Sequence, residues 1–303
     1  MMFRTDAITP KLGLMLGSTV LFTYLLMVMG TFVTSTGSGL ACPDWPLCYG
    51  SVAPPLELSI WFEWGHRLLG GITGVLIISS TLLVWKYQRG MPRALTAVIL
   101  AFLAVAVLLG GVTVLLEAPL LEGFAHVAVI STHLVIATLV LTCLVFTLRY
   151  VVGSGADTSM RYLPYLFGAV YLQVILGILV RYSGATLACP DFPLCNGAVV
   201  PDFTGYAVAL HYTHRVLALL IFLAAGAALL RAVRGGGGKR TAAVVFALVS
   251  CQAVFGMLVV LTGMFLPVII MHGATGFMLL GYLAYQSMPL LFGAGAERSP
   301  VRS

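Results

Sequence analysis

Eight long apolar runs constrain the fold of this chain more than any other feature of its sequence. Each run is continuously apolar and close to the length of about 20 residues that a helix needs to cross a bilayer. The runs do not alternate in polarity, which excludes a membrane β-barrel. Only 9% of the residues are charged, against about 25% in soluble domains. We therefore predict an all-α polytopic membrane protein with eight transmembrane helices. The predicted spans are 12–34, 61–84, 93–116, 121–148, 162–182, 205–230, 241–264 and 267–291.

The positions of the basic residues predict the orientation of these spans. Cytoplasmic loops of membrane proteins carry an excess of Lys and Arg. Of the 16 Lys and Arg residues, all but Arg67, Arg181 and Arg215 lie near a terminus or in a loop that follows an even-numbered span. We therefore expect both termini in the cytoplasm of a bacterium or archaeon, with the chain in its cytoplasmic membrane among lipid. The net charge of +6 then reflects topology and does not indicate a nucleic-acid partner.

A segment of the chain occurs twice. GTFVTSTGSGLACPDWPLC at 30–48 aligns without gaps with GILVRYSGATLACPDFPLC at 177–195, with 11 identities in 19 positions. The duplication divides the chain into two four-helix halves, 1–150 and 151–303. Because each half holds an even number of spans, we expect two parallel-repeat four-helix bundles related by an axis along the membrane normal.

Each copy of the repeat carries two cysteines six residues apart, in a loop predicted to face the outside. Disulfides persist on that oxidising side of a bacterial membrane. We predict one disulfide in each loop, Cys42–Cys48 and Cys189–Cys195, with a single zinc site of all four as the alternative. The spacing is C-x5-C with two prolines, not the C-x-x-C of thiol–disulfide exchangers, although a transient redox role for the first pair stays open.

Histidines lie on all the even-numbered spans, and ionisable side chains inside a bilayer usually mark a site. One imidazole from each of two facing helices is too few for a zinc or copper cage. Two such imidazoles suit the axial positions of a haem held in a helix bundle. We predict one haem position in each half, His66 with a histidine of the fourth span and His214 with His272. The six histidines are His66, His126, His133, His211, His214 and His272.

The fourth span offers two candidate ligands that are seven residues apart. His126 lies 16 residues beyond Gly110, and His272 lies 16 residues beyond Gly256. This correspondence between the halves favours His126. His133 is the alternative ligand, and otherwise has a supporting role.

The two halves differ beside the first histidine, where one reads EWGHR and the other HYTHR. Glu63 therefore stands where the second half has His211. A carboxylate beside a macrocycle can stabilise developing positive charge or move a proton, so we predict that Glu63 is catalytic. Its alternative role is an ion pair with Arg67, four residues on. Arg67 and Arg215 are predicted to bind haem propionates, unless they only extend to the membrane interface.

This combination of features resembles the haem A synthase family. The resemblance rests on eight spans in two halves, E-x-x-H-R on the second span, a histidine on each even-numbered span and the paired-cysteine loops, and it covers nearly the whole chain. It implies that the C8 methyl of haem O is oxidised to a formyl group, giving haem A for terminal oxidases. It further implies haem O as substrate between His66 and His126, with Glu63 near the reacting methyl. Haem b is then the cofactor between His214 and His272.

The resemblance also implies a haem O synthase as the donor of the substrate. It leaves open the electron donor, the source of oxygen and the oligomeric state. A homo-oligomer is compatible with the resemblance. A two-haem cytochrome b-type electron-transfer subunit is the competing interpretation, and it would not need Glu63. Complete cysteine pairs in both halves, together with His133 and His211, depart from one uniform family pattern.

Overall fold

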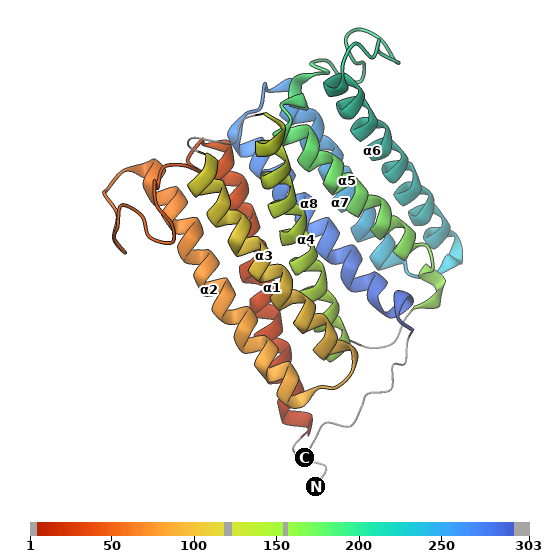
Figure 1. Cartoon of the computed structure of the whole chain (residues 1–303). Helices are drawn as coiled ribbons and strands as arrows, with labels where there is room; N and C mark the ends of the chain where they lie inside the picture. Colours follow the sequence, from red (N-terminus) through yellow and green to blue (C-terminus); the bar gives the residue numbers. More distant parts are fainter. Residues whose placement is uncertain (1–4, 118–122, 154–156, 294–303) are drawn as a thin grey trace. The chain divides into compact units, whose positions relative to one another are not determined.

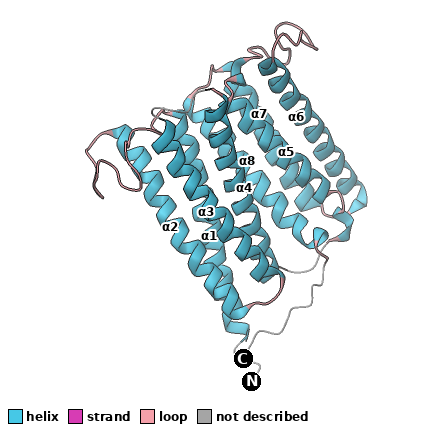
Figure 2. Cartoon of the chain, in the orientation of Figure 1, coloured by secondary structure: helices cyan, strands magenta, loops and turns pink. Residues whose placement is uncertain are grey.

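The computed structural model describes residues 5–117, 123–153 and 157–293, and every long regular element in these ranges is a helix (Figure 2). Eight of the helices are long and apolar enough to cross a membrane, as the sequence predicts, and the chain is a multi-pass membrane protein (Figure 1). The helices are α1 (Thr5–Ser35), α2 (Leu58–Tyr87), α3 (Met91–Glu117), α4 (Phe124–Val152), α5 (Leu163–Tyr182), α6 (Tyr206–Arg231), α7 (Lys239–Leu261) and α8 (Leu266–Leu291).

Several helices extend beyond the apolar runs that predict them. α1 begins at Thr5 and α2 at Leu58, where the expected spans start at 12 and 61, and α4 ends at Val152. Backbone hydrogen bonding continues past the hydrocarbon boundary, because a helix end satisfies its peptide groups equally well in the polar interface. The first two residues of the expected span 121–148 lie outside the described residues.

The described helices form two compact units. One unit holds α1, α2, α3, α4 from Thr132 onward and the end of α8 from Ala284. A core of aliphatic side chains joins α2, α3 and α4 within it, and the Thr19 hydroxyl of α1 lies 2.7 Å from the Ser80 hydroxyl of α2. The four fully or nearly buried members of that core are Ile77, Ile99, Val140 and Leu144.

The other unit holds α5, α6, α7, the start of α4 up to Ser131 and α8 up to Leu283. Phe222 of α6 packs against Phe246 of α7 with 5.3 Å between ring centroids. Both unit boundaries fall inside helices, so the division into halves at 150, and the parallel relation of those halves, stay predictions. Within each unit, however, the elements that carry the repeated motifs can be compared residue by residue.

Candidate functional site

The first cysteine loop, between α1 and α2, is closed by a covalent bond and by hydrogen bonds to one carboxylate. The sulfurs of Cys42 and Cys48 are 2.00 Å apart. The carboxylate of Asp44 accepts hydrogen bonds from the backbone N–H groups of Tyr49 at 2.6 Å and Gly50 at 2.7 Å. These bonds, chiefly the one from Gly50, hold the pKa of Asp44 below its ordinary value.

The second cysteine loop, between α5 and α6, repeats this construction. Cys189 and Cys195 form a disulfide with an S–S distance of 1.96 Å. The carboxylate of Asp191 accepts from the backbone N–H groups of Asn196 at 2.7 Å and Gly197 at 2.8 Å. Both predicted disulfides are therefore present. The zinc alternative is excluded, because each of the four sulfurs is bonded to its partner in one of two separate disulfides.

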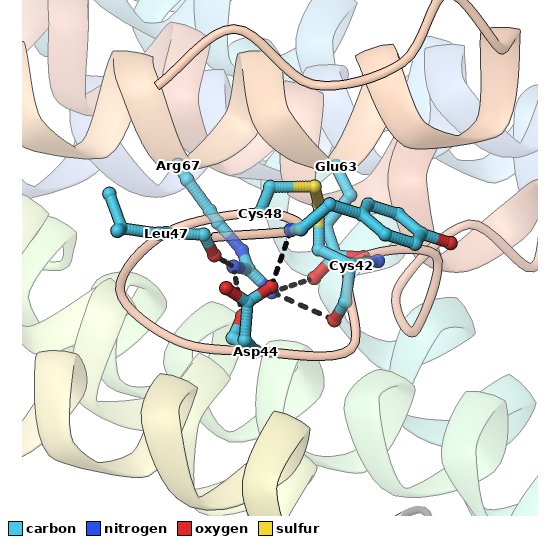
Figure 3. A network of polar contacts seen from close by, with 7 residues as sticks. Cys42, Asp44, Leu47, Cys48, Glu63 and Arg67 are labelled. Atoms are coloured by element: carbon cyan, nitrogen blue, oxygen red, sulfur yellow. Dashed lines mark hydrogen bonds and ion pairs between the residues drawn. A yellow bond between two sulfur atoms is a disulfide. The ribbon is translucent and has the colours of Figure 1, made fainter. Parts of the chain in front are cut away.

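Arg67 of α2 holds the first loop to the helix (Figure 3). Its guanidinium donates to the backbone carbonyls of Asp44 at 2.6 Å, Leu47 at 2.5 Å and Cys42 at 3.3 Å. It also forms an ion pair with Glu63 at 2.5 Å. Arg67 thus joins three loop carbonyls to a helix carboxylate.

Arg215 of α6 does the same for the second loop. Its guanidinium donates to the backbone carbonyls of Asp191 and Leu194, both at 2.8 Å, and Cys189 at 2.5 Å. Its Nε–H donates to Nε2 of His211 at 3.2 Å. The predicted propionate binding by Arg67 and Arg215 stays a prediction, and the described hydrogen bonds of the two guanidinium groups go to loop carbonyls and to Glu63 or His211. Residue spacing could not indicate this use, because the carbonyls come from 20 to 26 positions earlier in the chain.

Glu63 and His211 occupy equivalent places beneath their loops. Glu63 is 3% exposed, and its Oε2 accepts the backbone N–H of Cys42 at 2.7 Å. His211 is 4% exposed, and its Nδ1 lies 3.3 Å from the backbone nitrogen of Cys189. Glu63 also accepts from Arg67 one turn later, and Nε2 of His211 lies 3.2 Å from Nε of Arg215, although a neutral imidazole accepts at only one of its two nitrogens. His211, whose role the sequence leaves open, is therefore the neutral counterpart of Glu63.

His66 of α2 and His133 of α4 lie close enough to interact electrostatically. Each ring faces a glycine of a neighbouring helix. A methyl group built on Gly30 of α1 would lie 3.1 Å from Cε1 of His66, and one on Gly110 of α3 would lie 3.6 Å from Cε1 of His133. The absence of a side chain at these glycines lets both imidazoles approach the helix backbone.

His214 of α6 and His272 of α8 form a second pair of the same kind, and they too interact electrostatically. A methyl group on Gly177 of α5 would lie 3.1 Å from Cε1 of His214. A methyl group on Gly256 of α7 would lie 3.1 Å from Cε1 of His272. In each unit, therefore, two histidines from even-numbered helices are seated on glycines from odd-numbered helices.

Of the two candidate ligands on α4, His133, the alternative, is the one that interacts electrostatically with His66. Its Nδ1 lies 2.9 Å from the carbonyl oxygen of Ala106 on α3, a contact that orients the ring. His126 is half-buried in the first turn of α4, two turns earlier. Counting residues from Gly110 favoured His126, because the count assumes that both helix connections and both helix starts have the same length.

The chemistry of these pairs fits haem better than a metal cage. Among the described residues, no group of three or more His, Cys, Asp or Glu side chains could hold a metal ion. Each unit instead supplies two imidazoles. Nδ1 of His214 is buried without a hydrogen-bond partner in the described structure, and Nδ1 of His66 and His272 has only the backbone of Leu26 or Gln252 nearby, outside good hydrogen-bond geometry. Buried polar atoms are normally satisfied, so these rings have capacity for a group that the protein itself does not provide.

Two glutamines approach the second pair, and the sequence analysis did not single them out. Nε2 of Gln173 lies 2.9 Å from the carbonyl oxygen of His214 and 3.2 Å from its Nε2. Nε2 of Gln252 lies 3.4 Å from Nε2 of His272. Both glutamines stand four residues, about one helical turn, before the glycine that faces the same ring. This four-residue spacing between glutamine and glycine occurs in both halves of the second unit and is visible in the sequence alone.

One family model and several named proteins match this chain over most of its length. The family model for COX15-CtaA, described as a cytochrome oxidase assembly protein, matches residues 14–60 and 57–284. A protein of Bacillus mycoides (strain KBAB4) named heme A synthase is 34% identical over 290 residues, covering 87% of this chain and 89% of that protein. Proteins of the same name from Bacillus cereus (strain G9842) and Bacillus anthracis (strain A0248) are each 33% identical over 288 residues, covering 87% of this chain and 88% of theirs.

Proposed function

The chain belongs to the COX15-CtaA family of cytochrome oxidase assembly proteins, and from that premise we propose that it is a haem A synthase. In this proposal it oxidises the C8 methyl of haem O to a formyl group, giving haem A for terminal oxidases. Relatives that carry this name match it over 87% of its length. The single observation that carries the proposal is the buried carboxylate of Glu63, one helical turn before one histidine of a facing pair.

Four histidines would hold two haems as axial ligands. His66 and His133 would hold the haem O substrate, and His214 and His272 would hold haem b as a resident cofactor. The seating of each ring against a glycine supports this assignment, because a fixed imidazole presents its nitrogen in one direction. His126 was the first choice from the sequence, and the electrostatic interaction between His133 and His66 favours His133 instead.

A bound haem supplies the redox-active iron, and the protein supplies the environment of the reacting methyl. Glu63 is buried, and both of its carboxylate oxygens accept hydrogen bonds. Such a carboxylate can stabilise positive charge on a nearby macrocycle or hold a proton that leaves it. Arg67 and the N–H of Cys42 fix the orientation of Glu63, so its free lone pairs point in a defined direction.

The competing interpretation, a two-haem electron-transfer subunit, does not use Glu63 and is not favoured by the named relatives. Thiol–disulfide exchange is disfavoured because the cysteines of the first pair are almost completely covered, with Cys42 1% and Cys48 0% exposed. Exchange requires a thiolate to reach a sulfur.

The proposed location is a bacterial or archaeal cytoplasmic membrane, with both termini in the cytoplasm and both cysteine loops outside. The excess of basic residues in the loops after even-numbered helices supports this orientation. A haem O synthase is the proposed donor of the substrate. Lipid is proposed to surround both that enzyme and this chain. A homo-oligomer is compatible with these features.

Cofactor analysis of the purified full chain tests the proposal. Haem extraction with mass spectrometry and pyridine haemochrome spectra should detect haem b together with haem O or haem A. Haem b alone, at two per chain, would favour the electron-transfer subunit. Protein without any haem, from cells that make both haem b and haem O, would exclude both interpretations.

A further inference from the structure

A groove in the second unit lies between α5 and α6, two helices that run side by side (Figure 1). Its volume is about 490 Å³, within the range of about 300–1,000 Å³ that is usual for small-molecule sites. On α6 the lining begins at Leu217 and ends at Arg231. Small side chains form much of the wall between these ends, namely Ala169 of α5 and Ala224, Ala227 and Ala228 of α6.

The corresponding surface of α2 in the first unit is packed differently. Counted from the paired histidines, Ala228 corresponds to Ser80 and Arg231 corresponds to Leu83. Ser80 is fully buried, and its hydroxyl lies 2.7 Å from that of Thr19 on α1. Ala228 has no such group, so α6 leaves a space beside α5 where α2 packs onto its neighbour. The change to arginine places a cation at the end of that space.

The end of the groove at Arg231 is basic. A second hollow of about 580 Å³ adjoins it there, shares Ala227 and Arg231 with it, and is also lined by Arg234. Both guanidinium groups are exposed, and in the described ranges of the chain neither forms an ion pair with a carboxylate. Arg231 interacts electrostatically with Tyr162, the residue that precedes α5. A negatively charged ligand would therefore meet two arginines that no carboxylate neutralises.

Two connections pack together at this basic end and support it. A methyl group built on Gly237 would lie 2.6 Å from Oγ of Ser159, and one built on Gly238 would lie 2.5 Å from Sδ of Met160. Both glycines have a positive φ, so the close approach depends on glycine. The carboxylate of Asp157 accepts the N–H and the hydroxyl of Ser159. The acidic group of this connection is thus already engaged within its own turn.

The length of the groove matches one leaflet of a bilayer. Leu217 and Arg231 are 14 residues apart on α6, which corresponds to about 21 Å at 1.5 Å per residue. A bilayer with its headgroups is about 40–45 Å thick, so one leaflet takes up about 20–22 Å. Tyr162 and Tyr165 line the groove at the same end as Arg231, and tyrosines are enriched at the membrane interface. The apolar part therefore spans the depth of an acyl chain, and the basic part lies at the depth of its headgroup.

We propose that this groove binds one anionic phospholipid, with its phosphate on Arg231 and Arg234 and one acyl chain along the alanines. Charge complementarity selects the headgroup, because arginine forms strong hydrogen bonds to phosphate and basic residues beside a membrane helix attract anionic lipids. The leaflet is the cytoplasmic one, according to the orientation predicted from the basic residues. The acyl chain would reach Leu217, about one turn beyond His214. The inference does not depend on which haem the second histidine pair holds.

Lipid binding to the full chain, purified in a nonionic detergent, tests the proposal. Phosphatidylglycerol added to the micelles should raise the midpoint of thermal unfolding, because a ligand that binds the folded state stabilises it. Phosphatidylcholine with the same acyl chains should give a much smaller shift, and so should inorganic phosphate. Native mass spectrometry should detect retained phosphatidylglycerol at one molecule per chain.

Two variants change the headgroup end and the acyl-chain part separately. We expect Arg231→Gln to weaken phosphatidylglycerol binding about tenfold, the effect of losing a charge-assisted hydrogen bond. Ala227→Leu fills the groove, keeps every charge and should also weaken the binding of this lipid. Arg240→Gln is the matched control, because it removes the same charge from an exposed residue that does not line the groove. It should bind phosphatidylglycerol as the wild type does.

Three results would overturn the proposal. Equal stabilisation by phosphatidylglycerol and phosphatidylcholine, or unchanged binding in Arg231→Gln, would exclude recognition of an anionic headgroup. A full shift with inorganic phosphate alone would indicate a site for free anions. Stabilisation by added ubiquinone that Arg231→Gln leaves unchanged would assign the groove to a quinone. If Arg231→Gln does not accumulate in the membrane, Ala227→Leu decides the question, since unchanged lipid binding in that variant would place the lipid elsewhere.

Discussion

The two cysteine loops are built from the same contacts and differ at one buried position beneath them. In each loop a disulfide, an aspartate and an arginine hold the same backbone groups. In one loop Glu63 faces the backbone N–H of Cys42, and in the other His211 faces the backbone N–H of Cys189. The first arrangement buries an ion pair, whereas the second pairs an arginine with a neutral ring.

This difference shows that supporting a loop does not require a carboxylate. The two ring nitrogens of His211 lie near the same loop N–H and arginine groups as the carboxylate oxygens of Glu63, and a neutral ring that accepts only one of these bonds lies beneath a loop of the same construction. Burying a charge is costly even when it is paired, so the charge of Glu63 is expected to have a use beyond the loop. The predictions below test that difference between the two regions, beginning with the largest expected effect.

Removing the fourth-helix ligand should have the largest effect. We expect His133→Ala to abolish haem A formation and to yield protein that contains haem b but no haem O or haem A, because His66 loses its facing partner. His126→Ala, seven residues earlier on α4, is the control and should form haem A at close to the normal level. Mass spectrometry of extracted haems measures both, and the opposite result would restore the assignment made from residue spacing.

Glu63→His transfers the arrangement of the second loop to the first. An imidazole can reach both places, as His211 does, and can accept one of the two hydrogen bonds, from Cys42 or from Arg67, but the carboxylate is lost. Haem A formation should fall by about 10²–10⁴-fold, the usual range for a group that transfers a proton, while haem b content stays unchanged. Quantifying haem A in membranes checks this. A variant that makes haem A normally would limit Glu63 to supporting the loop.

The two arginines should differ in their contribution to stability. Arg67→Ala leaves the buried carboxylate of Glu63 without its partner, which costs about 3–5 kcal/mol. Arg215→Ala leaves only loop carbonyls and the neutral His211, which costs about 1–3 kcal/mol. Thermal unfolding of both variants in the same detergent measures the difference. Equal losses would indicate that Glu63 is protonated or that water replaces the guanidinium.

Three of the glycines that face the histidines, Gly30, Gly177 and Gly256, leave little room for a side chain. In Gly177→Ala the new methyl would lie 3.1 Å from Cε1 of His214, so the ring must move. We expect a several-fold loss of haem b per chain. Gly168→Ala, on the same helix, meets nothing within 4 Å and should retain haem b. Pyridine haemochrome spectra compare the two, and equal haem contents would show that the ring position is not critical.

The smallest expected effect is the response of the loops to acid. Hydrogen bonds lower the pKa of both Asp44 and Asp191 from the ordinary value of 3.8. The aspartates therefore stabilise the loops above that pH, and the contribution is lost as the pH falls through their lowered values. Limited proteolysis with an acid-active protease should cut both loops only at the lowest pH. A marked difference in cleavage between the loops would mean that the two loops are less alike than their hydrogen bonds indicate.

The sequence by itself determined the eight membrane helices, the two disulfide loops and the contrast between Glu63 and His211. Continuous apolar runs of this length have no other stable arrangement in lipid, and a duplicated motif makes a single changed residue visible. These features depend on local sequence, so they could be read without coordinates.

Only the tertiary structure decided which residues meet across helices. Spacing within a helix fixes the face of a residue but not its depth relative to a neighbouring helix, which depends on the lengths of connections and helix ends. That is why counting from Gly110 favoured His126, whereas in the structure His133 is the histidine of α4 that interacts electrostatically with His66. For the same reason the loop contacts of Arg67 and the approach of Gln173 to His214 appear only in three dimensions.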